Sequence, residues 1–296
     1  MILLTGASGK TGKVLVKTLS KIESVCAFVY REEHISVLKK SGADKVIVGD
    51  MRDESAIRLA LDGVSSVYHI CPNMNPDEFE VGRLMITEAR KADVGHFAYH
   101  SVLHPQTEKM SHHWQKLRVE GMIFESELPF TILQPAPYMQ NLLAGWKSMI
   151  EEGVLRVPYS VHSKFSFVDL EDVAQAAKIV LTEPGHMNVV YELAGTNPMS
   201  HVEAAEILSR ALNRDVRAEQ EEIRDWKHSA STSTPTNGGS AQREGYVIEN
   251  LVRMFEYYDQ WGLVGNPNVL RRILKREPTS LESFVDRIVE ENNAAN

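Results

Sequence analysis

The sequence has little cysteine, no long apolar run and no excess of positive charge. Only two cysteines, Cys26 and Cys71, occur in 296 residues, and both lie in apolar stretches, so we expect no disulfide framework. No apolar run is long enough to span a bilayer, and the N-terminus lacks a basic segment followed by a hydrophobic core. We therefore expect a cytoplasmic protein with no membrane partner.

The charge and composition limit the class of protein further. The formal net charge is −8, and the basic residues are spread along the chain, which argues against a nucleic-acid partner. With 43% hydrophobic and 24% charged residues, the chain has the composition of a globular protein of one large or two interlocked domains.

Short apolar runs alternate with amphipathic segments through the first half of the chain. The runs cover residues 2–4, 25–30, 45–50, 64–70, 96–101 and 130–135. Such alternation predicts an α/β fold, a Rossmann-like doubly wound parallel sheet with helices on both faces. We expect a smaller, mainly helical C-terminal substrate region after it.

The loss of this rhythm after Pro135 suggests where the regions divide. We predict a nucleotide-binding domain over residues 1–150, to which 165–182 return as a strand and a helix, and a substrate region over 151–164 and 183–296. Ser200 and Glu203 have capping-box spacing, which predicts a helix over residues 200–212. Residues 229–242, SASTSTPTNGGSAQ, are polar without apolar periodicity and predict a mobile loop or lid of undefined role.

The stretch TGASGKTG at residues 5–12 could match either of two phosphate-binding loops. The mononucleotide pattern G-x-x-x-x-G-K-[ST] would need a glycine where Leu4 stands. A dinucleotide loop fits at every position: Gly6 for the tight turn, Gly9 for approach to a pyrophosphate, and Gly12 for packing of the helix on the sheet. The loop's other candidate cofactor contacts are Thr5, Ser8, Lys10 and Thr11.

The end of the second predicted strand indicates which dinucleotide is bound. An acidic residue there hydrogen-bonds a free ribose hydroxyl, whereas an arginine neutralises a 2′-phosphate. The strand ends at Arg31, with Glu32 and Glu33 only afterwards, which favours NADP(H); the alternative is that Arg31 is a solvated surface charge. Asp50, after the third strand, either hydrogen-bonds the adenine or caps the next helix.

Several further motifs follow in a characteristic order. They are VYR at 29–31, GDM at 49–51, YHSVLHP at 99–105, HHWQKLRVE at 112–120, QPAPYMQN at 134–141, FVDLEDVAQA at 167–176 and REPTSLESFVDR at 276–287. With TGASGKTG they resemble the NmrA-like branch of the atypical short-chain dehydrogenases/reductases over most of the chain. The resemblance implies a Rossmann-like domain with a smaller C-terminal substrate region, NADP(H) binding, and activity either as a reductase or as a redox-sensing regulator.

Ligands of such sheets gather beyond the carboxyl ends of the strands. We therefore place Tyr138 and Asn141 near the nicotinamide, with Asn141 and His112 as substrate contacts and Tyr138 serving both ligands. The remaining candidate cofactor contacts are Met51, Cys71, Pro72, Lys116 and Pro135.

Candidate catalytic residues lie around the fifth predicted strand. Short-chain dehydrogenases use Tyr-x-x-x-Lys and a serine; here Lys116 and Ser101 match, but His112 stands at the tyrosine position. His112 and Lys116 share a helix face. Two interpretations remain open: His112 is a general acid, as its ordinary pKa permits, or it lines the cleft while Lys116 positions the nicotinamide ribose.

Five histidines gather in this region, which raises the question of a metal. They are His96, His100, His104, His112 and His113. Zinc-site spacings such as H-E-x-x-H are lacking in the sequence, so we expect no metal.

Three functions are compatible with these residues. The first is an NADP(H)-binding oxidoreductase that transfers a hydride to or from a small carbonyl, enone or quinone-like substrate. A conjugated acceptor has the least need of the proton that the missing tyrosine would donate, because delocalisation stabilises the anion and solvent can protonate it. The alternative is a non-catalytic NADP(H)-binding redox sensor that acts through a protein partner; an isomerase or lyase that recycles its cofactor is a third reading. Substrate identity and oligomeric state, including a homodimer, stay open.

Overall fold

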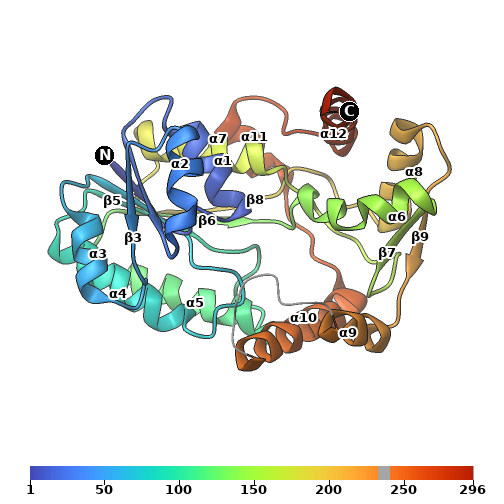
Figure 1. Ribbon diagram of the computed structural model, residues 1–296, viewed down its shortest axis with the longest axis horizontal. Helices are drawn as coiled ribbons and strands as arrows, with labels where there is room; N and C mark the ends of the chain where they lie inside the picture. The colour runs from blue at the N-terminus through green and yellow to red at the C-terminus, as the bar shows by residue number, and fades with distance from the viewer. Residues whose placement is uncertain (233–240, 296) are drawn as a thin grey trace. The chain divides into compact units, whose positions relative to one another are not determined.

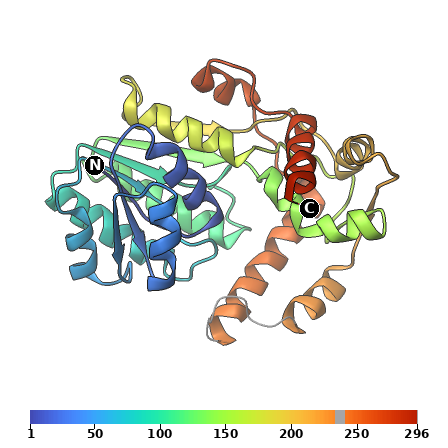
Figure 2. The same ribbon diagram turned by 45° about the horizontal axis from the view of Figure 1, so that its top comes forward.

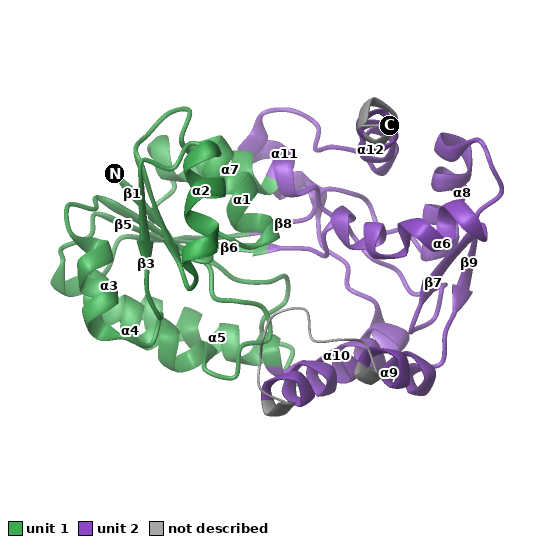
Figure 3. Cartoon of the chain, viewed as in Figure 1, with its two compact units in different colours: residues 1–108, 112–134, 173–191 green, residues 109–111, 135–172, 192–296 purple. Residues whose placement is uncertain are grey.

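The structure is a computed structural model that describes residues 1–232 and 241–295. The chain divides into two compact units, shown in Figure 3. Unit 1 comprises residues 1–108, 112–134 and 173–191, and unit 2 comprises residues 109–111, 135–172 and 192–296.

A seven-stranded sheet in the order β3-β2-β1-β4-β5-β6-β8 forms the centre of unit 1. The strands are β1 (Ile2–Leu4), β2 (Val25–Val29), β3 (Lys45–Val48), β4 (Ser66–His69), β5 (His96–His100), β6 (Phe130–Pro135) and β8 (Val189–Leu193). The pairs from β3 to β6 are parallel, and Leu4 at the end of β1 pairs with Ala27 on β2 and Tyr68 on β4. The strand order thus reverses at β1, where open parallel sheets bind nucleotides.

Helices cover both faces of this sheet (Figures 1 and 2). One face carries α1 (Lys10–Leu19), α2 (Ile35–Lys40) and α7 (Leu170–Thr182), and the other carries α3 (Glu54–Leu61), α4 (Glu78–Lys91) and α5 (Ser111–Phe124). Strands β2 and β5 are buried along their whole length, as expected for strands covered on both faces. Buried residues of α3, α4 and α5 form a hydrophobic core with Phe28 and Phe97 of the sheet. The predicted Rossmann-like α/β fold is confirmed.

Unit 2 is mainly helical and contains a two-stranded parallel sheet of β7 (Val154–Val157) and β9 (Arg217–Gln220). Its helical elements are the 3₁₀-helix η2 (Met139–Gly145), α6 (Trp146–Glu151), α8 (His201–Leu212), α9 (Ile223–Thr232), α10 (Ala241–Trp261), α11 (Pro267–Leu274) and α12 (Leu281–Ala295). The predicted capping box is present at the start of α8, with Ser200 and Glu203 bonded reciprocally. No helix in the described residues is long and apolar enough to cross a membrane.

The unit boundaries differ from those we drew from the sequence. Residues 135–150 belong to unit 2, because η2 and α6 pack on β7. Residues 183–191 belong to unit 1, because β8 adds the last strand of the large sheet. The strand expected at the start of residues 165–182 is not regular: Phe165 forms isolated bridges with Met199 and Leu263.

The polar stretch over residues 229–242 is a second difference. Residues 229–232 belong to α9 and residues 241–242 to α10, so the expectation of a loop is wrong at both ends. Residues 233–240 lie outside the described residues. Serine, threonine and alanine can continue a helix where neighbouring turns support it, although their polarity conceals this in the sequence.

Candidate functional site

Two glycines of the TGASGKTG loop are required by the protein's own backbone. Gly6 has φ of +61°, and a Cβ there would lie 2.8 Å from the Ile70 carbonyl oxygen. A Cβ at Gly12 would lie 2.3 Å from the Gly6 carbonyl oxygen. A side chain at either position would therefore force the loop and the helix apart, in line with the turn and packing roles expected of them.

Gly9 differs from its two neighbours. Its φ of −72° suits any residue, and a Cβ would meet only the Gly6 carbonyl oxygen, at 3.4 Å. Protein packing therefore does not require glycine here, whereas a ligand approaching the backbone would. Gly9 also caps α1 without a side chain, so the amides of its first turn, from Lys10 to Gly12, face an anion-binding position. These features fit the pyrophosphate of a dinucleotide.

Thr5 fastens this loop to the next strand. Its hydroxyl accepts a hydrogen bond from the Ile70 amide at 2.8 Å and contacts Nδ1 of His69 at 2.9 Å. The side chain is fully buried, whereas Ser8 and Thr11 are partly exposed. Thr5 thus joins the ends of β1 and β4, a local role that differs from the direct cofactor contact expected of it.

The ends of β2 and β3 carry the residues expected at the adenosine. The Arg31 side chain is 42% exposed, and its Nη1 lies 3.4 Å from Glu33 Oε1. Asp50 accepts from the guanidinium of Arg52, with Nη2 at 2.7 Å from Oδ2, which raises the pKa of Arg52. Asp53 caps α3 through the Ser55 amide, so the alternative that Asp50 caps this helix is wrong.

Arg52 was missed by sequence reasoning, although its place directly after the GDM motif could have indicated it. Its side chain is 60% exposed and follows β3, which pairs with β2; Arg31 and Asp50 lie just after the ends of these two strands. Met51, before it, is half-buried.

A buried ion pair lies at the carboxyl end of β5. Lys116 Nζ lies 3.0 Å from Glu78 Oε1 and donates to the His100 carbonyl at 3.4 Å. The Tyr99 hydroxyl donates to the same Glu78 oxygen at 2.9 Å. Lys116 and Glu78 are only 4% and 3% exposed, so each charge depends on the other for compensation.

Sequence reasoning missed Glu78, although one signal points to it. Gly82, one turn further along α4, has no room for a Cβ, which would lie 2.7 Å from Val119 Cγ2 on α5. The two helices therefore approach closely at this point, and this brings Glu78 and Lys116 together.

Cys71 follows β4 and lies in the same buried region. Asn75 Nδ2 donates to its sulfur at 3.2 Å. Burial, reinforced by the Glu78 carboxylate, raises the pKa of the thiol well above its ordinary value, so it stays protonated. The neighbouring Pro72 is exposed.

Ser101, the candidate catalytic serine, bonds to a glutamate of α5. It is fully buried, and its hydroxyl donates to Glu120 of α5. Gln134 Nε2 donates to both oxygens of Glu120 at 3.0 Å. Burial raises the pKa of Glu120 against these hydrogen bonds. Within the described residues no hydrogen bond joins Ser101 to His112 or Lys116, so the structure does not assemble these three as a hydrogen-bonded triad.

His112 is buried to 6% exposure, and its ring stands edge-on to that of His113 at 4.6 Å between centroids. Burial, with His113 and Lys116 adding to it, lowers the pKa of His112 to about 2. This lowered pKa weighs against the interpretation of His112 as a general acid near neutral pH, because burial destabilises the imidazolium. Among the described residues its Nδ1 has no hydrogen-bond partner.

Burial also lowers the pKa of His96, His100 and His113. The pKa of His100 falls to about 3 and that of His113 to about 4. Nδ1 of His100 contacts the Tyr68 hydroxyl at 2.8 Å, and Nε2 of His96 contacts Thr131 Oγ1 at 2.8 Å. No three histidine, cysteine or acidic side chains within residues 1–232 and 241–295 converge on a metal position.

The remaining candidates lie at the start of unit 2. Pro135 ends β6 and is buried, whereas Tyr138 is half-buried and precedes η2. Asn141 is exposed. Tyr138 forms an isolated parallel bridge with Val168, which fixes the backbone of this segment beside the start of α7.

Comparison with known proteins places this arrangement in a family. The family model described as the NmrA-like family matches residues 1–285. The chain belongs to the NmrA-like family. Among related proteins, the chain is 30% identical to the NAD(P)H azoreductase of Xenophilus azovorans over 219 residues, which cover 73% of this chain and 76% of that protein.

Two further relatives are similar. Quinone oxidoreductase 2 of Escherichia coli (strain K12) is 29% identical over 219 residues, again 73% of this NmrA-like chain and 76% of the relative. The crystal structure of the NADPH-dependent quinone oxidoreductase of Escherichia coli complexed with NADPH superposes with a TM-score of 0.83 at 26% identity, and covers 98% of this chain and 100% of that one.

Proposed function

We propose that this NmrA-like protein is an NADP(H)-dependent oxidoreductase that passes a hydride to a quinone or a similar conjugated acceptor. The observation that carries the cofactor assignment is the loop around Gly9, where protein packing does not require glycine and the start of α1 has no side-chain cap, which suits an anion. The names of its relatives, an NAD(P)H azoreductase and a quinone oxidoreductase, support the acceptor class.

The chain's own residues bind and orient the cofactor in this proposal. The amides that start α1 hold the pyrophosphate, and Arg31 binds the 2′-phosphate of the adenosine ribose. Lys116, fixed by Glu78, keeps one compensated positive charge beside the carboxyl end of β5. When bound, the nicotinamide supplies the hydride.

His112 decides which acceptors suit the site. With a pKa of about 2 it is neutral at pH 7, so it offers a hydrogen bond but no imidazolium proton. An isolated carbonyl needs an acid to stabilise the alkoxide that forms, whereas a quinone spreads the negative charge over its ring and takes its proton from water. The neutral histidine therefore favours conjugated acceptors.

The test is to follow the loss of NADPH absorbance with 1,4-benzoquinone and with cyclohexanone, a ketone without conjugation. We expect turnover with the quinone and much slower turnover with the ketone. Tight NADPH binding without oxidation by any quinone or azo dye would contradict the proposal and favour the redox sensor. We also propose a cytoplasmic setting, where the two buried free cysteines stay reduced.

A further inference from the structure

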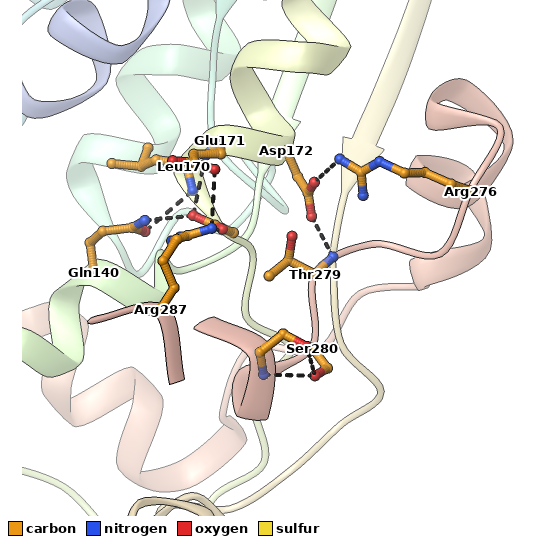
Figure 4. Close-up of polar contacts among 10 residues, drawn as sticks. Gln140, Leu170, Glu171, Asp172, Arg276, Thr279, Ser280 and Arg287 are labelled. Atoms are coloured by element: carbon orange, nitrogen blue, oxygen red, sulfur yellow. Dashed lines mark hydrogen bonds and ion pairs between the residues drawn. The ribbon is translucent and has the colours of Figure 1, made fainter. Parts of the chain in front are cut away.

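Two buried aspartates near the start of α7 are each held by an arginine from the C-terminal part of unit 2 (Figure 4). Asp169 and Asp172 are both fully buried. Arg287 Nη2, on α12, lies 2.6 Å from Asp169 Oδ2. Arg276 Nη2, before α12, lies 2.5 Å from Asp172 Oδ1, and Figure 4 labels this second pair. The two ion pairs are thus matched in burial of the carboxylate and in the origin of the arginine, although Arg287 also pairs with Glu171 on α7, with Nη1 at 3.0 Å from Oε2.

The two pairs differ in their second partner. The other oxygen of Asp172 accepts from the Thr279 amide at 2.6 Å, so this pair binds the C-terminal segment to α7. The other oxygen of Asp169 accepts from Gln140 Nε2 at 2.6 Å, and Gln140 Oε1 accepts from the Leu170 amide at 3.3 Å. Only the pair of Asp169 and Arg287 therefore reaches η2.

Backbone hydrogen bonds also hold the start of η2 against the residues just before Asp169. The Met139 amide donates to the Val168 carbonyl at 3.0 Å, and the Val168 amide donates to the Pro137 carbonyl at 3.0 Å. The hydrogen bond from Gln140 to Asp169 adds a side-chain contact beside these backbone bonds. Arg287 neutralises the buried Asp169 carboxylate.

We propose that Asp169 and Arg287 are positioning residues that hold the segment from Tyr138 to Asn141 in the geometry that binds the acceptor. The proposal rests on the proposed function and on the substrate contacts predicted for Tyr138 and Asn141. A buried carboxylate that loses its arginine draws in water or pulls on its other donors, which for Asp169 are Gln140 Nε2 at 2.6 Å and the Glu171 amide at 3.2 Å. Small displacements of substrate-positioning groups reduce turnover strongly.

The first experiment compares Arg287→Met with Arg276→Met, because each removes a partly exposed arginine from a fully buried aspartate. Both variants should have a lower Tm. We expect Arg287→Met to raise the KM for 1,4-benzoquinone by about tenfold, with the Kd for NADPH unchanged. Arg276→Met should keep the wild-type KM. An equal rise in both variants, or in neither, would overturn the proposal.

A second variant cuts the same link without removing the ion pair. Gln140→Leu should raise the KM for 1,4-benzoquinone as Arg287→Met does, with a smaller fall in Tm. The double variant should show no larger KM than Arg287→Met alone, because both changes break one connection. Additive effects on KM would contradict a single connection through Asp169.

A third measurement does not need turnover. Hydrogen exchange of the Met139 amide should be faster in Arg287→Met than in Arg276→Met, because its acceptor lies on the stretch that Asp169 anchors. If wild-type protein fails to oxidise NADPH with quinones, the proposed function is wrong and this comparison alone decides the positioning role. Equal exchange in the two variants would then refute it.

Discussion

The glycine loop and the buried ion pair of Lys116 both lie at the carboxyl edge of the sheet in unit 1, but they are built differently. The loop from Gly6 to Gly12 works through backbone shape over seven consecutive residues. The ion pair joins side chains 38 residues apart, on two helices that pack closely. The comparison teaches that backbone sites can be recognised from local spacing, whereas compensated buried charges depend on tertiary packing.

The largest expected difference between the two regions is in the pH dependence of the free energy of unfolding. Acid pH should reduce it through the buried histidines and not through the glycine loop. Burial lowers the pKa of His69, His100, His112 and His113 from 6.5 to about 3, 3, 2 and 4. Because the unfolded chain binds these protons first, the stabilisation is complete above pH 6.5 and is lost as the pH falls. Each histidine should cost about 1.4 kcal/mol per pH unit well below pH 6.5.

Urea unfolding at pH 7 and pH 5 measures this loss. His112→Gln should reduce the difference between the two pH values by about 2 kcal/mol, since one buried proton acceptor is removed. An unchanged difference would mean that His112 is protonated alike in both states. The glycine loop contributes nothing to this effect, so Gly9→Ala serves as a control.

Among single substitutions, removing Lys116 should have the largest effect. Lys116→Met leaves the Glu78 carboxylate buried without a cation and should lower the free energy of unfolding by about 3–5 kcal/mol. The double variant Lys116→Met with Glu78→Leu should recover most of this loss, because it removes both charges. Urea titrations of the wild type, Lys116→Met and the double variant measure these free energies of unfolding. If the double variant were as unstable as Lys116→Met, the loss would be due to packing rather than to the unpaired charge.

Two substitutions in the glycine loop should have different effects, one on the stability of the protein and the other on NADPH binding. Gly12→Ala should destabilise the protein by about 1–3 kcal/mol, because its Cβ would enter the Gly6 carbonyl. Gly9→Ala should change stability by under about 1 kcal/mol yet weaken NADPH binding. Tm and fluorescence titration with NADPH measure the two properties. Equal loss of stability would remove the argument that Gly9 serves a ligand.

The smallest expected effect concerns the phosphate that distinguishes the cofactors. Arg31→Ala should raise the Kd for NADPH about tenfold, equivalent to about 1.4 kcal/mol, and leave the Kd for NADH unchanged. Arg52→Ala is the matched comparison, since that guanidinium is already paired with Asp50. Should both dinucleotides lose affinity equally, Arg31 would not read the 2′-phosphate.

Much of the fold was predictable because its signals are local. The apolar runs gave strands close to their observed limits, for example β2 at Val25–Val29, and Ser200 with Glu203 formed the expected capping box. The limits of the two units were less accessible, since the place of β8 beside β6 depends on the whole sheet. The candidate site followed the same division: the turn and packing roles of Gly6 and Gly12 could be read from their spacing, whereas Glu78, Arg52 and Arg287 were not singled out.

The sequence by itself determined the Rossmann-like fold, the dinucleotide loop and the NmrA-like family, because strand alternation, glycine spacing and motif order survive without any knowledge of distant contacts. Only the tertiary structure decided the state of the polar residues. His112 is neutral, Ser101 bonds to Glu120, and Lys116 is compensated by Glu78. Protonation and pairing depend on burial and on partners brought from elsewhere in the chain, and these exist only once the helices have packed.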